Sequence, residues 1–287
     1  MIRKLRNYLL DAQDRQRIAI ALAKGGAMMR ARRIDLARPA SWEFSGFSQN
    51  GEDGILDVLR SQLRSSNRYF VEIGTSDGIE NNSAWLVVAE RYAGLMIEGD
   101  PRLVERAQRT MLGYSIGAEC RAMFVTRETA PTLRDLAFHL DPDVFSLDID
   151  GNDYFVAEAL FQAGFRPKIF AVEYNSVFGP ERAVTIEYQE DFVFTRAHST
   201  HLYYGVSIAG WRRFFDLRGY RFISVERNGV NAFFVDPAHF DAAFLDGVQG
   251  LEFAENGYQL RKFHKPHQEQ FALIADRPLV PLDRGGR

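Results

Sequence analysis

Short apolar segments of six to eight residues recur through the central part of the chain, and segments with helical spacing separate them. The strand-like segments are 69–74, 93–100, 120–126, 144–150 and 168–175. The helix-like segments are 82–89, 101–111, 130–139 and 153–163. Strands that are buried on both faces of a parallel sheet are continuous apolar runs of this kind. Their alternation with helices predicts an α/β fold with a parallel sheet covered on both faces.

The pattern changes after residue 204. A helix-like segment, 205–220, precedes two apolar segments, 221–227 and 231–237, which are joined by Asn228-Gly229. An Asn-Gly pair between apolar segments is a strong signal for a tight antiparallel hairpin. We therefore expect a Rossmann-like fold whose mostly parallel seven-stranded sheet ends in an antiparallel hairpin.

The first 40 residues have a charge pattern of their own, with ten lysines and arginines against three aspartates, although the whole chain carries −3. We expect a basic helical segment over 1–46, the main domain over 47–275 and a frayed tail over 276–287. A basic amphipathic helix can bind an anionic membrane, an acidic partner or a second copy of the chain. A solvated helix packed on its own domain is the simplest alternative.

Composition narrows the class of protein. The chain has 287 residues, of which 46% are hydrophobic, so it can bury a full core. Its net charge gives no reason to expect a nucleic-acid partner. Cys120 is the only cysteine, which excludes a disulfide framework and a cysteine-based zinc site and favours a reducing, cytoplasmic location. No apolar run reaches the roughly 18 to 20 residues that span a bilayer.

The turn "EIGTSDG", residues 72–78, is the first candidate for ligand binding, because ligands bind beyond the carboxyl ends of strands in open α/β sheets. A dinucleotide fingerprint requires glycine at positions 74, 76 and 79, where this chain has Gly, Ser and Ile. Asp77 would also direct negative charge at a pyrophosphate. Glu98, which ends the second strand, can accept hydrogen bonds from ribose hydroxyls. A ribose-binding acid at this position fits either cofactor, but the missing glycines and Asp77 favour S-adenosylmethionine over NAD.

Five segments in order resemble the FkbM-type class I S-adenosylmethionine-dependent methyltransferases: "FSQNGEDGIL", "FVEIGTSDGIENN", "MIEGDP", "SLDIDGND" and "AVEYN". The resemblance spans about residues 47–235 and implies the class I methyltransferase fold and O-methylation of sugars, glycans or natural products. It also implies a cofactor site made of Gln49, Glu52, Glu72, Gly74, Thr75, Ser76, Asp77, Gly78, Glu98, Gly99 and Asp100. The chain departs from the family pattern at "LDIDGND", where a D-V-E-G-A-E-like string is usual, and at Asn175.

An acidic turn follows the fourth strand, where "LDIDGND" places Asp148, Asp150 and Asp153 within six residues. Carboxylates this close repel one another unless a cation, a donor-rich ligand or water offsets the repulsion. Asp153 is expected to begin the next helix. The fourth and fifth strands end side by side in such a sheet, which would bring Asp148 and Asp150 near Glu173 and Asn175. Oxygen ligands of this kind suit Mg²⁺, Mn²⁺ or Ca²⁺.

Methyl transfer to a hydroxyl requires that the hydroxyl lose its proton, with the help of a divalent cation or a general base. We expect Asp148 and Asp150 to be catalytic, and to bind a metal together with Glu173 and Asn175. Alternatively, the two aspartates bind the cofactor's amino group or act as the base directly, or they belong to a solvated turn. His201, in a loop-like segment, is a further catalytic candidate.

Two other functions fit parts of the sequence. An NAD-dependent oxidoreductase or epimerase would use the same type of sheet, but the missing glycines argue against it. A non-catalytic cofactor-binding scaffold could act through the basic N-terminal segment. The crowded carboxylates argue against the scaffold, because a site without catalysis has no need of them.

Overall fold

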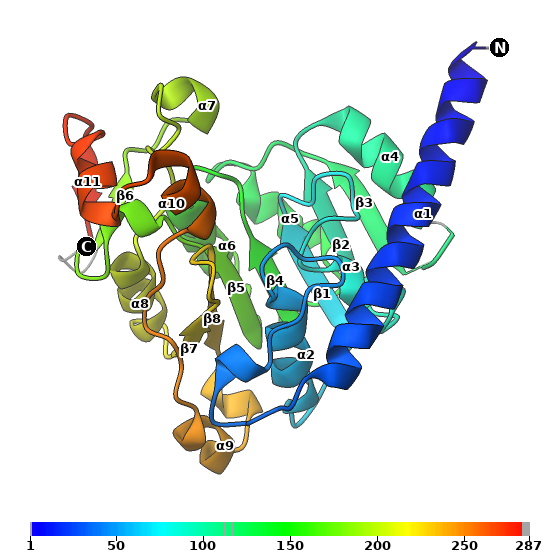
Figure 1. Ribbon diagram of the computed structural model, residues 1–287, viewed down its shortest axis with the longest axis horizontal. Coiled ribbons are helices and arrows are strands. Elements are labelled where there is room, and N and C mark those ends of the chain that lie inside the picture. The colour runs from blue at the N-terminus through cyan, green and yellow to red at the C-terminus, as the bar shows by residue number, and fades with distance from the viewer. Residues whose placement is uncertain (1, 112, 116, 283–287) are drawn as a thin grey trace.

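A seven-stranded sheet forms the centre of the protein in the computed structural model, which describes residues 2–111, 113–115 and 117–282 (Figure 1). Its strand order is β3-β2-β1-β4-β5-β8-β7. The strands are β1 (Tyr69–Ile73), β2 (Ala93–Glu98), β3 (Ala118–Ala122), β4 (Val144–Leu147), β5 (Ile169–Glu173), β7 (Arg221–Val225) and β8 (Asn231–Val235). The pairs among β1 to β5 are parallel, whereas β8 is antiparallel to both β5 and β7. The predicted Rossmann-like, mostly parallel seven-stranded sheet is confirmed.

The predicted hairpin is confirmed as well. Gly229 has a φ of +72°, a left-handed conformation that glycine adopts without strain, in the connection of residues 226–230 between β7 and β8. The carboxylate of Glu226 accepts hydrogen bonds from the backbone N–H groups of Val230 and Asn231, at 2.5 and 3.0 Å. The hairpin returns the chain so that β8 lies between β5 and β7.

Helices cover both faces of the sheet, because alternate side chains of each strand point to opposite faces. On β1, Tyr69 and Val71 belong to one apolar core and Phe70 to the other. The first face is covered by α5 (Leu133–Leu136), α6 (Asp153–Gln162) and α8 (Ile208–Asp216). The opposite face is covered by α2 (Glu52–Ser61), α3 (Ala84–Val88), α4 (Pro101–Met111) and α9 (Ala242–Gly247).

The long N-terminal helix α1 (Ile2–Ala31) lies along one flank of the molecule, beside α4 (Figure 1). Ile18 and Ala21 pack in a small apolar cluster with Trp85 of α3. The buried carboxylate of Asp14 pairs with Arg106 of α4. The basic segment therefore packs on its own domain, as in the simplest of the alternatives. Contact with an anionic membrane or a second subunit stays a prediction.

The largest differences from the predicted elements lie at segments whose partners are distant in sequence. Between α1 and β1 the chain forms η1 (Pro39–Ser41) and α2, and α2 was not among the predicted helices. The tail predicted to be frayed instead forms β9 (Leu279–Pro281), which pairs with β6 (Val184–Ile186); residues 283–287 of that tail lie outside the described residues. The other short helices are η2 (Ala130–Thr132), η3 (Ser176–Phe178), α7 (Phe194–Ala197), η4 (Pro237–His239), α10 (Gly257–Phe263) and α11 (His267–Ala272).

Within the described ranges, none of the helices combines the length and the apolar character that a membrane span requires.

Candidate functional site

Two adjacent cavities lie at the carboxyl ends of the parallel strands. The first, of about 450 Å³, lies over the ends of β1, β2 and β4. The second, of about 570 Å³, lies over the ends of β4 and β5 and is partly lined by α10. Gln49, Asp148 and Asp150 line both cavities. A ligand in one cavity therefore meets a ligand in the other at these three side chains.

Gly74 allows the end of β1 to approach the end of β4. Its φ is +92°, and a Cβ atom built there would lie only 1.7 Å from the carbonyl oxygen of Asp148. Any other residue would displace one of the two strand ends. The turn after β1 and the turn that carries Asp148 thus form one wall of the first cavity.

Glu98, at the end of β2, lines the first cavity with Gly99. Its carboxylate accepts hydrogen bonds from the backbone N–H groups of Ser76, at 2.8 Å, and Asp100, at 3.0 Å. An ionised carboxylate has about four acceptor positions, so two remain for a pair of vicinal hydroxyls. The geometry fits the role in ribose binding that the resemblance implies.

The predicted cofactor residues divide into two groups. Those that line the first cavity are Gln49, Gly74, Ser76, Glu98 and Gly99. The others do not line it and instead hold the surrounding backbone: Glu52, Glu72, Thr75, Asp77, Gly78 and Asp100.

Glu72 shows why the prediction was too broad. It is buried, and its two carboxylate oxygens accept hydrogen bonds from the backbone N–H groups of Asn82 and Ser83, each at 2.9 Å. Burial raises the pKa of Glu72 to about 7, against the lowering effect of these hydrogen bonds. Glu72 therefore supports the chain that leads into α3 and has no oxygen directed at the first cavity.

The other residues of this group also make structural contacts. The carboxylate of Glu52 accepts from the backbone N–H of Asn50 at 2.7 Å and from the side-chain amide of Asn231 at 2.8 Å. Asp77 pairs with Arg17 of α1 and Arg106 of α4. The Thr75 hydroxyl lies 3.4 Å from the carbonyl oxygen of Ile97, Gly78 packs against Ala107, and Asp100 accepts from the backbone N–H of Arg102.

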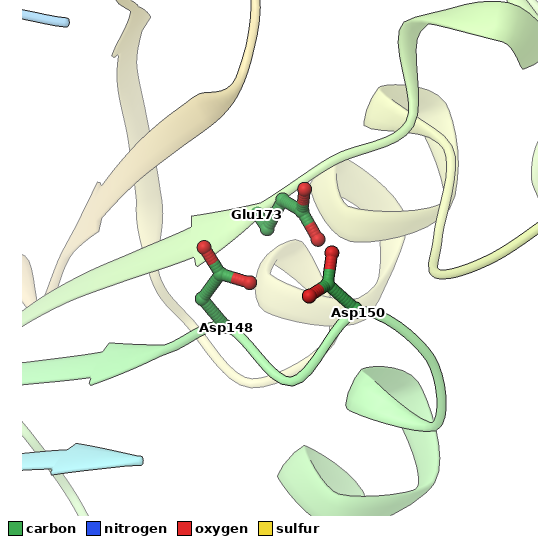
Figure 2. Close-up of side chains that lie close together, drawn as sticks. All are labelled: Asp148, Asp150 and Glu173. Atoms are coloured by element: carbon green, nitrogen blue, oxygen red, sulfur yellow. The ribbon is translucent and has the colours of Figure 1, made fainter. Parts of the chain in front are cut away.

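Three carboxylates converge where the cavities meet (Figure 2). Asp148 and Asp150 follow β4 and Glu173 ends β5, and one oxygen from each lies within 4.8 Å of the others. Burial, followed by repulsion from the neighbouring carboxylates, raises the pKa of both Asp148 and Glu173. Burial also raises the pKa of Asp150. A proton, a cation, a donor-rich ligand or water must offset the repulsion among these three carboxylates.

The cluster has the chemistry of a site for a hard divalent cation. Its donors are all carboxylate oxygens, which Mg²⁺ and Mn²⁺ prefer. Glu173 is only 7% exposed, yet its Oε2 atom has no hydrogen-bond partner among the residues that the structure describes. A buried acceptor without a partner is unfavourable, and a bound cation or a ligand hydroxyl would satisfy it.

Asp153 lies beside the cluster and supports it. As expected, it begins α6. Its carboxylate accepts hydrogen bonds from the backbone N–H groups of Ile149, at 3.0 Å, and Gly151, at 2.9 Å. These two bonds fix the turn on which Asp150 adopts a φ of +54°. Burial raises the pKa of Asp153 to about 6.

Asn175, predicted as a metal ligand, has a structural role. Its side-chain amide donates to the carbonyl oxygens of Leu202, at 2.8 Å, and Tyr204, at 3.0 Å, and its Oδ1 atom accepts from the backbone N–H of Val177 at 3.1 Å. Both ends of the amide are thus engaged, and the side chain is fully buried. Asn175 attaches the 202–204 segment to the end of β5, and we correct its assignment accordingly.

His201 lines the second cavity, where its ring packs edge-on against Phe194 at 5.8 Å between ring centroids. Most of the other residues of this cavity were not predicted from the sequence. They include Tyr204, Gln259, Arg261 and Lys262. The last three lie outside the segment that resembles the methyltransferases, so no motif marked them.

No protein-family model matches the chain, and no curated protein matches it. Solved structures with a similar fold include an O-methyltransferase from Bacillus cereus in complex with SAH, at 13% identity and a TM-score of 0.42, covering 76% of this chain and 89% of that chain. The O-methyltransferase TomG from Streptomyces achromogenes, in complex with SAM, has 16% identity and a TM-score of 0.44, with coverage of 75% and 88%. The SAH-bound methyltransferase PaMTH1 from Podospora anserina has 11% identity and a TM-score of 0.44, with coverage of 75% and 87%. We infer the function from the two cavities rather than from these weak similarities.

Proposed function

We propose that the protein is an S-adenosylmethionine-dependent O-methyltransferase of the FkbM type, acting on a hydroxyl of a sugar, a glycan or a small natural product. The observation that carries the proposal is the meeting of the two cavities at Asp148 and Asp150. S-adenosylmethionine occupies the first cavity with its ribose on Glu98. The acceptor occupies the second, so that its hydroxyl reaches the methyl group beside the two aspartates.

The start of α3 supports this cofactor over NAD. A pyrophosphate binds where the N–H groups at a helix N-terminus are free. Here the backbone N–H groups of Asn82 and Ser83 bond to Glu72, and that of Ala84 bonds to the side chain of Asn81 at 2.8 Å. The protein itself thus satisfies the donors that a dinucleotide would need.

The chemistry is a direct transfer in which the acceptor oxygen forms a bond to the methyl carbon as the bond from that carbon to sulfur breaks. If no cation occupies the cluster, the hydroxyl proton passes to one of its carboxylates, which leaves S-adenosylhomocysteine and the methyl ether. Asp148 and Asp150 suit this role because their pKa is raised, which makes a carboxylate a better proton acceptor. His201, on the wall of the second cavity, is an alternative acceptor for the proton.

Asp148, Asp150 and Glu173 would hold a divalent cation such as Mg²⁺ or Mn²⁺, and Asn175 is not among its ligands. Such an ion supplies positive charge that lowers the pKa of an acceptor hydroxyl. The three carboxylates have raised pKa values, so cation binding must displace any proton that they retain. Cation affinity should therefore increase with pH.

The first test is calorimetry with S-adenosylhomocysteine, NAD and UDP-glucose, followed by methyl transfer from labelled S-adenosylmethionine to a panel of sugars. We expect binding of S-adenosylhomocysteine and no binding of NAD. Binding of NAD alone would overturn the proposal in favour of an oxidoreductase or epimerase. Cofactor binding without transfer to any sugar, glycan or natural-product hydroxyl would instead favour the non-catalytic scaffold.

A further inference from the structure

The second cavity contains two cationic side chains that the protein does not neutralise. Arg261 and Lys262 lie in the last turn of α10 and line this cavity. Among the described residues, neither forms a salt bridge or donates a side-chain hydrogen bond. The nearby acids have other partners, since Glu255 pairs with His267 and Glu269 with Lys265. Lys262 lies over the Phe263 ring, 5.1 Å from its centroid, a contact that leaves its charge unneutralised. Both positive charges therefore remain available to an anionic ligand.

The same cavity holds buried oxygen atoms that lack donors. Gln259 is only 6% exposed and donates to the Tyr204 hydroxyl at 3.2 Å, yet within the described ranges its Oε1 atom has no hydrogen-bond partner. Glu173 Oε2 is likewise unpartnered. Buried acceptors of this kind are normally satisfied, and the hydroxyl groups of a ligand would supply the missing donors.

The charges of this cavity are divided between different elements. The acidic side chains, Asp148, Asp150 and Glu173, follow β4 and β5, whereas the basic pair lies on α10. No salt bridge joins the two sets in the described part of the chain, so they are more than 4.0 Å apart. A ligand with a hydroxyl at one end and an anion at the other would match both sets, and the reverse orientation would place the anion against the carboxylates.

Resting on the proposed function, we propose that the acceptor is a polyhydroxylated molecule with an anionic group, a phosphate or a carboxylate. Arg261 and Lys262 bind the anionic group, and Gln259 accepts a hydrogen bond from a hydroxyl. This arrangement presents another hydroxyl to Asp148 and Asp150. Acceptor charge thus determines which hydroxyl is methylated.

The test uses the full chain saturated with S-adenosylhomocysteine and three matched probes: glucose, glucose 6-phosphate and glucuronic acid. Calorimetry compares the wild type with the Arg261→Gln/Lys262→Gln double variant. The control is Lys24→Gln/Arg30→Gln, which removes the same charge from exposed positions of α1. We expect an anionic probe to bind the wild type about ten- to a hundredfold more tightly than glucose, as charge-assisted hydrogen bonds would produce. The α10 variant should lose this preference, and the control should keep it.

The outcomes separate the possible explanations. Preference for glucose 6-phosphate alone identifies a phosphate as the anion, and preference for glucuronic acid alone identifies a carboxylate. Equal affinity for all three probes, no binding of either anionic probe, or a preference that survives in the α10 variant overturns the proposal. Basic residues that only stabilise a helix C-terminus would change the melting temperature and leave the preference unaltered. Failure to bind S-adenosylhomocysteine would instead refute the proposed function itself.

Discussion

Replacing Glu98 with alanine tests the assignment of the first cavity most directly. The substitution removes a carboxylate that lines the cavity and that two backbone N–H groups already orient. If the ribose hydroxyls of the cofactor bond to this carboxylate, the variant leaves them without acceptors. The loss should amount to about 1–3 kcal/mol, the cost of unpaired polar groups in a binding site. Affinity for S-adenosylhomocysteine should therefore fall by roughly 5- to 150-fold.

The control is Glu72→Gln, because Glu72 is another acid at the end of a strand but does not line the cavity. Glutamine would place an amide N–H group against the backbone N–H of Asn82 or Ser83. We expect a loss of about 1–3 kcal/mol in the free energy of unfolding, with cofactor affinity of the folded protein unchanged.

Calorimetry measures the affinities, and thermal unfolding of the unliganded variants measures the stability. The two variants should change different quantities: Glu98→Ala should weaken cofactor binding, and Glu72→Gln should lower the melting temperature. Wild-type affinity in Glu98→Ala would refute the assignment of the ribose site. Weakened binding in both variants would show that the structural role of Glu72 is not separable from cofactor binding.

The remaining predictions concern the carboxylate cluster and α1. Asp148→Asn and Asp150→Asn should fold but lose about 10²- to 10⁴-fold in the rate of methyl transfer, measured as S-adenosylhomocysteine release. Wild-type turnover in both variants would show that the two aspartates belong to a solvated turn without a catalytic role. EDTA should abolish methyl transfer, and Mg²⁺ or Mn²⁺ should restore it. Full activity in EDTA would show that no cation is required and that the carboxylates act as the general base and as ligands of the cofactor. The pKa of Glu173 is raised in the folded state, so ionisation of Glu173 destabilises the fold. Without a cation, the melting temperature of the wild type should fall as pH rises above about 4.5, and that of Glu173→Gln should fall less. Equal pH profiles for the two proteins would show that Glu173 does not cause the fall. Deleting residues 1–31 should lower the melting temperature, because it exposes Trp85, and an unchanged value would contradict the packing of α1.

Local patterns predicted the sheet and the place of the site. The apolar run before Asp148 and the one before Glu173 identified neighbouring strands, and the rule that parallel strands end at one edge brought the two acids together. The Asn228-Gly229 pair identified the hairpin without any knowledge of its partner strand. These features depend on residues close together in sequence or on a general rule of sheet geometry.

The orientation of individual side chains could not be predicted in the same way. Glu72 and Glu98 both occupy strand ends, yet one bonds to the backbone before α3 and the other lines the cavity. Asn175 offered an oxygen ligand by composition, but the carbonyl oxygens that engage its amide belong to residues more than 25 positions away. The strand β9 depends on a partner, β6, that lies 93 to 97 residues earlier in the sequence. Contacts between residues this far apart in sequence leave no local sequence pattern.

The two cavities draw on different stretches of the chain, which bears on how the protein could be altered. Apart from Phe192, the first cavity is lined by residues up to Asn152. Apart from Gln49, Asn50 and the three carboxylates, the second is lined by residues from Phe194 onward. Under the proposed function, segments 194–204 and 256–263 could be exchanged between enzymes to change the acceptor while the cofactor cavity stays intact. Such a graft must retain the Asn175 bonds and the Tyr204–Gln259 pair, because they join the interchangeable half to the sheet.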